Sequence, residues 1–249
     1  MFEGLRKPTE LIVIVVTLLA YGCPLQAIVH AYGLDERTVA RRLDRAGEHC
    51  EEVHQAIVVQ RQLDLQHVQA DEVRAKGRGM VVWMAMALMV STRLWLGGVV
   101  SVRRDRTLAD RLLLLVRACA QPLRPLLVCT DGWAPYPGSI LRAFREKVKG
   151  RGKGRPRLEV WPELVIGRVV KHTKAKHVVK VSHDLVRGTM QAALRLLKAS
   201  CGGTMLNTAY IERFNGTLRE RLASLTRRCR HAAHRNVSDR LHLQPLLAS

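Results

Sequence analysis

Three acidic residues of this 249-residue chain stand where carboxylates for phosphodiester chemistry would stand. Asp71 and Asp131 each follow an apolar, strand-like run, and Glu212 lies one turn into a segment with helical periodicity. Carboxylates from two strands and a helix can converge on a pair of Mg²⁺ (or Mn²⁺) ions, because hard divalent cations prefer oxygen ligands. One ion activates the attacking oxygen and the other stabilises the leaving oxygen. The pattern therefore predicts Asp71, Asp131 and Glu212 as both catalytic and metal-binding residues.

Each of these acidic residues also has a plain structural interpretation. Asp131 precedes a glycine, and this is a frequent turn pair. Asp71 could simply end a strand, and Glu212 could pair with Arg219 on a solvated helix face. Taken together with the order of elements and the basic charge, the three positions favour the catalytic interpretation. Other acidic residues compete for the ligand roles: Asp64, Glu72 and Glu220.

The elements that must position these residues follow from periodicity and turn signals. The order is strands, a helix, a strand, a helix, and then further strands and helices, which is typical of an α/β fold with a mixed sheet. For residues 63–226 we expect a ribonuclease-H-like mixed sheet with flanking helices, although periodicity alone does not select it over other mixed folds. The expected strands cover residues 63–70, 80–90, 94–102, 126–130, 164–170 and 177–181, with a hairpin at Thr92-Arg93. The expected helices run from a Thr107/Asp110 capping box through Cys119, over 139–147 and 189–198, and around Glu212.

Residues 1–62 form a separate expected module, all helical. Residues 9–46 read as three short helices, with Thr9 and Asp35 as possible caps, and residues 47–62 as a helical linker. This is a helix-turn-helix pattern, although a plain helical bundle with a solvated basic face would show the same periodicity. Three arginines share one face of the third helix and are predicted to contact DNA: Arg37, Arg41 and Arg45.

The net charge of +20 points to a polyanionic partner. Most of the excess lies in residues 141–249, whereas residues 1–70 hold slightly more acidic than basic residues. Lysine and arginine displace condensed counterions from phosphates, so double-stranded DNA is the expected partner. A basic, glycine-rich loop over 147–157 and the helix of Glu212 supply further predicted contacts: Lys147, Lys149, Arg151, Lys153, Arg155, Arg157, Asn215 and Arg219.

The cysteines and the apolar segments indicate a cytoplasmic, nucleoid-associated protein. None of the six cysteines forms a C-x-x-C pair, so free thiols in a reducing compartment are expected and a zinc ribbon is not. The most apolar run, residues 11–20, is too short to span a bilayer. We therefore expect no membrane partner.

Three motifs carry a resemblance to a known family: Val68–Glu72 (VQADE), Thr130–Pro137 (TDGWAPYP) and Asn207–Asn215 (NTAYIERFN). The chain resembles the DDE-type insertion-sequence transposases of prokaryotes over roughly residues 9–225. The resemblance implies Asp71, Asp131 and Glu212 as the catalytic triad, a ribonuclease-H-like core, dependence on Mg²⁺, and terminal inverted repeats as substrate. It also implies a homo-oligomer that holds two DNA ends.

The chain departs from that family at both ends. It begins without the zinc-binding segment that such proteins often carry, and residues 227–249 read as an irregular basic tail. No aromatic residue follows Phe214, so the chain is expected to be a truncated or frameshifted copy with weak or no activity. Three alternatives stay open: a non-catalytic helix-turn-helix regulator, a cellular ribonuclease or resolvase with the same core, and an inactive transposase remnant.

Overall fold

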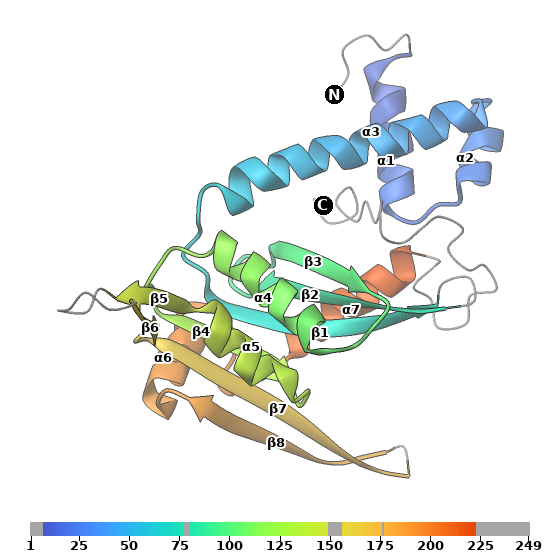
Figure 1. Cartoon of the computed structure of the whole chain (residues 1–249). Helices are drawn as coiled ribbons and strands as arrows, with labels where there is room; N and C mark the ends of the chain where they lie inside the picture. The colour runs from blue at the N-terminus through green and yellow to red at the C-terminus, as the bar shows by residue number, and fades with distance from the viewer. Residues whose placement is uncertain (1–6, 77–79, 149–155, 176, 223–249) are drawn as a thin grey trace. The chain divides into compact units, whose positions relative to one another are not determined.

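A computed structural model describes residues 7–76, 80–148, 156–175 and 177–222. The chain divides into two compact units, each described by itself below (Figure 1). The first comprises Met1–Arg61, Ala75–Val81 and Gly216–Ser249, and the second comprises Gln62–Arg74 and Val82–Asn215. The expected tail 227–249 lies outside the described residues.

The first unit contains three helices, α1 (Thr9–Ala20), α2 (Leu25–Tyr32) and α3 (Glu36–His54), followed by a π-helical turn, η1 (Gln55–Val59). Gly33 ends α2 in the left-handed conformation (φ 57°), which glycine adopts without strain. Asp35 caps α3 as expected, since its side chain accepts from the Thr38 N–H at 3.1 Å. Thr9 is not a cap, because Pro8 precedes the first turn. The helices share a buried apolar cluster: Val15, Leu19, Ile28, Leu34 and Val39.

The three predicted DNA-contacting arginines lie on the exposed side of α3. Arg37, Arg41 and Arg45 are all exposed, while Val39 on the same helix is fully buried. Helix α3 also continues through the first half of the expected linker, to His54, and η1 follows it. The placement of the arginines is what a docking helix requires; a DNA-binding role for this helix stays a prediction.

A six-stranded mixed sheet organises the second unit, in the order β3-β2-β1-β4-β7-β8. Strand β4 pairs in parallel with β1 and with β7, whereas the β2–β3 and β7–β8 pairs are antiparallel. The predicted antiparallel hairpin at Thr92-Arg93 is therefore confirmed. The strands are β1 (Gln66–Lys76), β2 (Val81–Met89), β3 (Trp95–Ser101), β4 (Leu126–Asp131), β7 (Leu164–Lys174) and β8 (His177–Arg187).

Helices cover both faces of this sheet (Figure 1). Helices α4 (Arg106–Cys119) and α5 (Pro135–Ala143) lie on one face, and α6 (Met190–Ala199) and the first part of α7 (Ala209–Arg221) lie on the other. Asp105 caps α4 through the Leu108 N–H at 3.1 Å, so the expected capping box at Thr107 is wrong. Helix α6 buries an apolar stripe against β4 and β7, and the shared cluster contains Leu127, Cys129, Val165, Ala193, Leu196, Leu197 and Leu206.

Two of the expected elements differ from the structure around the basic loop. The helix predicted over 139–147 begins earlier, at Pro135, because proline suits the first turn of a helix. Residues Arg145–Val148 (β5) and Arg157–Val160 (β6) then form a small antiparallel sheet instead of a loop. The Phe144 and Trp161 rings meet edge to face at 5.1 Å at its base. Lys147 and Arg157 thus lie in strands, whereas Lys149, Arg151, Lys153 and Arg155 lie outside the described residues.

The second unit is thus an α/β unit with a mixed sheet and flanking helices, an arrangement compatible with the expected ribonuclease-H-like fold. In the part of the chain that the structure describes, no helix combines the length and apolarity needed to cross a bilayer. The cysteines of that part are free thiols: Cys23, Cys50, Cys119, Cys129 and Cys201.

A buried histidine links β1 to the end of α6. His67 is fully buried, and its Nδ1 lies 3.1 Å from the Ser200 hydroxyl. Because the hydroxyl lies 2.8 Å from the Leu196 carbonyl and can donate to it, the histidine is suited to donate from Nδ1 in its neutral form. Burial, with Arg93 nearby, lowers the pKa of His67 to about 4.

This shift predicts a loss of stability in acid. The unfolded chain binds a proton on His67 below its ordinary pKa of 6.5, whereas the folded protein resists protonation until about 4. The free energy of unfolding is therefore expected to fall by about 3 kcal/mol between those two pH values relative to a His67→Asn variant. Urea titrations of both proteins at pH 7 and pH 4.5 measure the difference, and parallel pH profiles would contradict the prediction.

Candidate metal centre

The register of two parallel strands brings the predicted aspartates together. In the β1–β4 pair Ala70 lies opposite Thr130, so Asp71 and Asp131 follow at the same level of neighbouring strands. Asp131 is the last residue of β4, as expected. Asp71 does not end its strand, because β1 continues to Lys76. The continuation also places Glu72 in the strand, where successive side chains point to opposite faces.

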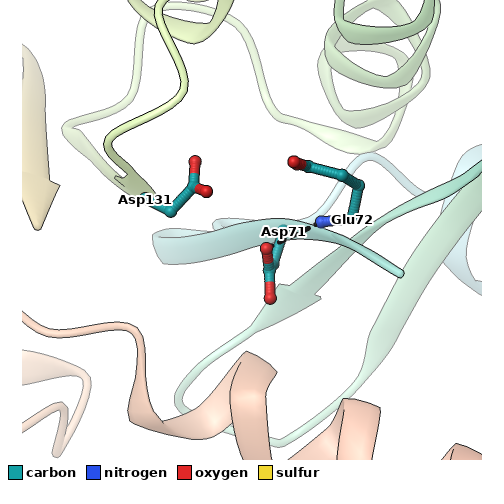
Figure 2. A group of neighbouring side chains, drawn as sticks. All are labelled: Asp71, Glu72 and Asp131. Carbon is teal, nitrogen blue, oxygen red and sulfur yellow. Dashed lines mark hydrogen bonds between the residues drawn. The ribbon is translucent and has the colours of Figure 1, made fainter. Parts of the chain in front are cut away.

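Three carboxylates converge at this point, and they are Asp71, Glu72 and Asp131 (Figure 2). Each offers one oxygen atom, and the three atoms lie within 4.8 Å of one another. Figure 2 shows Asp71 and Glu72 leaving opposite sides of β1. A set of hard oxygen donors at this spacing suits a divalent cation such as Mg²⁺ or Mn²⁺ after small side-chain shifts. Among the described residues, Glu212 is not part of this group.

Asp71 is held by two hydrogen bonds, one to each oxygen. Its Oδ1 accepts from the Glu72 N–H at 2.8 Å, and its Oδ2 accepts from the Asn215 amide at 2.7 Å. Burial, and then the neighbouring Glu72 carboxylate, raise the pKa of Asp71 to about 7; Asp131 and Glu212 add to the rise, and the Glu72 N–H opposes it. A pKa this high is unusual for an aspartate, and a positive charge placed beside the carboxylate would lower it again.

Glu72 has both carboxylate oxygens engaged by cationic or phenolic donors. The Arg104 guanidinium donates to Oε1 from Nε at 2.6 Å and also from its Nη2. The Tyr136 hydroxyl, on α5, donates to Oε2 at 2.9 Å. Burial and Asp131 raise the pKa of Glu72, and the bonds from Arg104 and Tyr136 offset part of that rise. Glu72 is therefore fixed in place more firmly than either aspartate.

Arg104 supplies the positive charge of the group. Besides bonding Glu72, its Nη2 lies 3.9 Å from Asp131 Oδ2. The guanidinium stacks over the Trp133 ring at 4.6 Å and the Trp83 ring at 5.1 Å. Trp133 in turn packs edge to face on Tyr136 at 5.2 Å. The Trp83 and Trp133 rings thus hold the Arg104 guanidinium beside the carboxylates of Glu72 and Asp131.

Glu212 is directed to a different partner. Its Oε1 accepts from Lys171 Nζ at 2.6 Å and from the Thr208 hydroxyl at 2.6 Å. Partial burial raises the pKa of Glu212, but Lys171 and Thr208 outweigh it, and the net shift is downward. The carboxylate still lies close enough to contribute to the raised pKa of Asp71. Glu212 therefore borders the acidic group as a charged carboxylate paired with lysine.

One buried side chain fixes the start of α7 relative to the acidic group. Gln69 Oε1 accepts from the backbone N–H groups of Tyr210 and Ile211 at 3.0 and 3.1 Å. Its Nε2 donates to the Asn207 carbonyl at 2.9 Å and to the Asn207 side-chain oxygen at 3.1 Å. Gln69 thus satisfies orphan donors at the N-terminus of a helix that follows it by more than a hundred residues in sequence.

Asn215 and Arg219, the two residues of α7 predicted to contact DNA, differ in burial. Asn215 was expected to bind phosphate, but the structure buries it at 2% exposure and bonds it to Asp71. Its Oδ1 is buried without a hydrogen-bond partner among the described residues. Arg219 is half-buried one turn further along the helix. Asn215 therefore orients Asp71, whereas a DNA contact of Arg219 stays a prediction.

Comparison with known proteins adds no identification: no protein-family profile matches the chain, and no curated protein matches it significantly.

Removing the hydrogen bonds between Gln69 and the first turn of α7 should lower the stability of the fold measurably. Replacing Gln69 with Leu leaves two buried N–H groups of α7 without an acceptor, which costs about 2–4 kcal/mol in the free energy of unfolding. Gln191→Leu, at an exposed position of α6, is the matched control and should stay within about 0.5 kcal/mol of wild type. Chemical denaturation of the three proteins measures the effect, and equal losses in both variants would refute this role of Gln69.

The raised pKa of Asp71 predicts that stability and metal affinity depend on pH in opposite senses. Without metal, the folded state favours the protonated carboxyl, so this contribution is full below 3.8 and is lost as pH rises through about 7. Asp71→Asn should therefore stabilise the metal-free protein by about 4 kcal/mol at pH 8, and negligibly at pH 3.5.

Mg²⁺ requires the deprotonated carboxylate, so the increase in Tm that it produces should be larger at pH 8 than at pH 6. Thermal unfolding with and without Mg²⁺ measures this shift. The exposed Glu163→Gln variant is the control and should retain the wild-type pH dependence. A Tm increase by Mg²⁺ that is equal at both pH values would exclude Asp71 as a ligand.

Proposed function

We propose that the chain is a metal-dependent polynucleotidyl transferase of the DDE insertion-sequence transposase type, which cleaves DNA at element ends and transfers the freed strand into target DNA. The observation that carries the proposal is the group of three carboxylate oxygens within 4.8 Å, at the level where two parallel strands of a mixed sheet meet. The basic net charge of +20 supports a polyanionic substrate.

The donor set fits Mg²⁺ or Mn²⁺ as the resident ion. Asp71 and Asp131 would hold it, since neither is saturated by hydrogen bonds to the extent that Glu72 is. The bound ion would neutralise charge on the phosphate and lower the pKa of water. The residues of the chain supply the rest: Asn215 orients Asp71, and Arg104 and Tyr136 hold the Glu72 carboxyl group in place beside Asp131.

The reaction that we propose needs no covalent protein intermediate. Water attacks the phosphodiester at the element end, and the bond to the leaving oxygen breaks to free a 3′-hydroxyl. That hydroxyl then attacks a target phosphodiester in line, with the target's own 3′-oxygen leaving. Two ends must be present together for both strands to be joined, so a homo-oligomer on DNA is part of the proposal.

The third acidic ligand is either Glu72 or Glu212. Glu72 belongs to the group by geometry, but Arg104 and Tyr136 already engage it. Glu212 carries the family resemblance, and its Lys171 pair is half exposed, which costs little to break. We propose Glu212 as the catalytic third carboxylate and Glu72 as the residue that holds Arg104. Glu72→Gln and Glu212→Gln, compared for Mg²⁺ affinity and for cleavage, separate the two roles.

A second candidate, a non-catalytic DNA-binding protein, is favoured by one observation. Arg104 already lies against the carboxylates of Glu72 and Asp131 and offsets their charge. An inactive remnant that had lost its metal ion would need such a substitute positive charge. That candidate requires site-specific binding without metal and no strand cleavage. The next experiment distinguishes the two functions.

Asp131→Asn is expected to abolish Mg²⁺-dependent nicking and to leave DNA binding in place. An amide cannot neutralise the metal's charge, and losing several kcal/mol of transition-state stabilisation lowers the rate by about a hundredfold or more. Nicking of supercoiled plasmid carrying the element ends measures the rate, and gel shift without metal measures binding. Glu163→Gln should nick at the wild-type rate. A wild-type chain that binds the ends and never nicks them would favour the second candidate.

The exposed arginines of α3 give a separate prediction for DNA docking. Replacing Arg37, Arg41 and Arg45 with alanine should weaken binding to the element ends and lower the slope of log affinity against log salt by about three. The fold should be nearly unaffected, because the three side chains are exposed. Fluorescence anisotropy across a salt series, with circular dichroism as a check of folding, tests this. Unchanged affinity would exclude α3 from docking.

A further inference from the structure

The β7–β8 hairpin projects beyond the neighbouring strand of the sheet (Figure 1). Strand β4 pairs with β7 only as far as the Asp131–Val169 pair, and the two strands of the hairpin then continue as a ribbon paired only to each other among the described residues. We call residues 170–175 and 177–181 the arm. Residues 171–175 and 177–181 are all exposed. A two-stranded ribbon without a packed face is marginal by itself, so an arm of this kind is expected to have a partner.

The charge of the arm is of one sign. Residues 164–183 contain no aspartate or glutamate. Across the ribbon His172 lies opposite Lys180 and Lys174 lies opposite His177, so that basic side chains face each other. These pairs contain no side chain of opposite charge that would stabilise the ribbon, and a bound anion would supply the missing negative charge. The basic residues of the arm are Lys171, His172, Lys174, His177 and Lys180.

The arm starts at the candidate metal centre. Asp131 pairs with Val169, one residue before the arm begins, and Lys171 reaches Glu212 at 2.6 Å. A phosphate chain that passes along the arm would therefore arrive beside the carboxylates. None of the sequence motifs discussed above assigns a function to this segment.

We propose that the arm is a binding surface for the phosphate backbone of duplex DNA that leads into the metal centre, an inference that rests on the proposed function. A two-stranded ribbon is narrow enough to lie in or along the major groove. Lysines on both strands can contact phosphates on either side of it, which positions the duplex without reading its sequence. The exposed valines of the arm, Val178, Val179 and Val181, would contact the sugars of the backbone.

Edge-to-edge pairing with a second copy is the competing use of this surface, because β8 is the last strand of the sheet. Two features oppose it. The register shifts between His172 and Thr173, and a bulge of this kind twists the ribbon away from flat pairing. Lys180 also lies on the edge strand, and an exposed lysine at a sheet edge opposes pairing with a second sheet. The charge and the bulge therefore favour a polyanion over a second sheet.

The test compares two double variants of the full-length chain. Lys174→Ala/Lys180→Ala removes two cations of the arm and leaves Lys171 with Glu212. Arg124→Ala/Lys198→Ala removes two exposed cations, before β4 and at the end of α6, away from the arm. Binding to a random-sequence duplex is measured by anisotropy without divalent metal over a salt series, and Tm confirms that each variant is folded.

The arm variant is expected to bind about tenfold more weakly at moderate salt, with a salt slope lower by about two, while the control variant matches wild type. Equal affinity of the arm variant and wild type would overturn the proposal, as would equal losses in both variants. A concentration-dependent dimer that disappears in the arm variant, with DNA binding intact, would assign the surface to a second copy instead.

These outcomes are independent of catalysis. A wild-type chain that binds duplex through the arm but never nicks DNA would leave the arm in place and refute the proposed transferase. A chain that nicks DNA while the arm variant binds and nicks as wild type would refute the arm alone.

Discussion

The interaction on which the rest of the second unit depends is the set of hydrogen bonds that Gln69 makes with Asn207 and the first turn of α7. Strand β1 and helix α7 are far apart in sequence, and apolar packing is less directional than a set of hydrogen bonds. A buried amide with all of its donors and acceptors used specifies one position and one orientation. The residues that follow on each element, Asp71 and Asn215, meet because of it.

The acidic group is a balance of unfavourable and favourable terms. Burial and repulsion between the carboxylates raise the pKa values of Asp71 and Glu72. The Arg104 guanidinium, which stacks on Trp133, offsets part of the rise for Glu72. Strongly shifted pKa values of this kind cluster at functional sites, where the groups bind a charged ligand. The charges of the site match a divalent cation. Arg104 supplies one positive charge beside three carboxylates, and a divalent cation would supply the other two.

Sequence alone predicted part of this site, and the reasons for the rest are physical. Asp71 and Asp131 were predictable because each follows an apolar run, and parallel strands bring such positions to one level. Glu72 was recognised only as a competitor, because strand β1 was expected to stop at Asp71, and a longer strand directs its side chain to the other face. Arg104 and Gln69 gave no signal, since a loop arginine and a strand glutamine acquire their roles only through partners distant in sequence. The helical character of residues 9–62 and the mixed sheet were predictable because periodicity is local, although the third helix was expected to be short and is continuous from Glu36 to His54. The small β5–β6 sheet was not predictable, because it forms beside a long-range pair, Phe144 with Trp161.

The stacking of Arg104 on two indoles has a consequence for observation. Trp83 and Trp133 are two of the four tryptophans in the chain, and both lie against the same guanidinium. Indole emission responds to the charge and polarity beside the ring, so any guest that takes over the carboxylates from Arg104 alters the surroundings of both rings together. The site thus contains its own optical reporter, and its occupancy can be followed in the unlabelled protein by light alone.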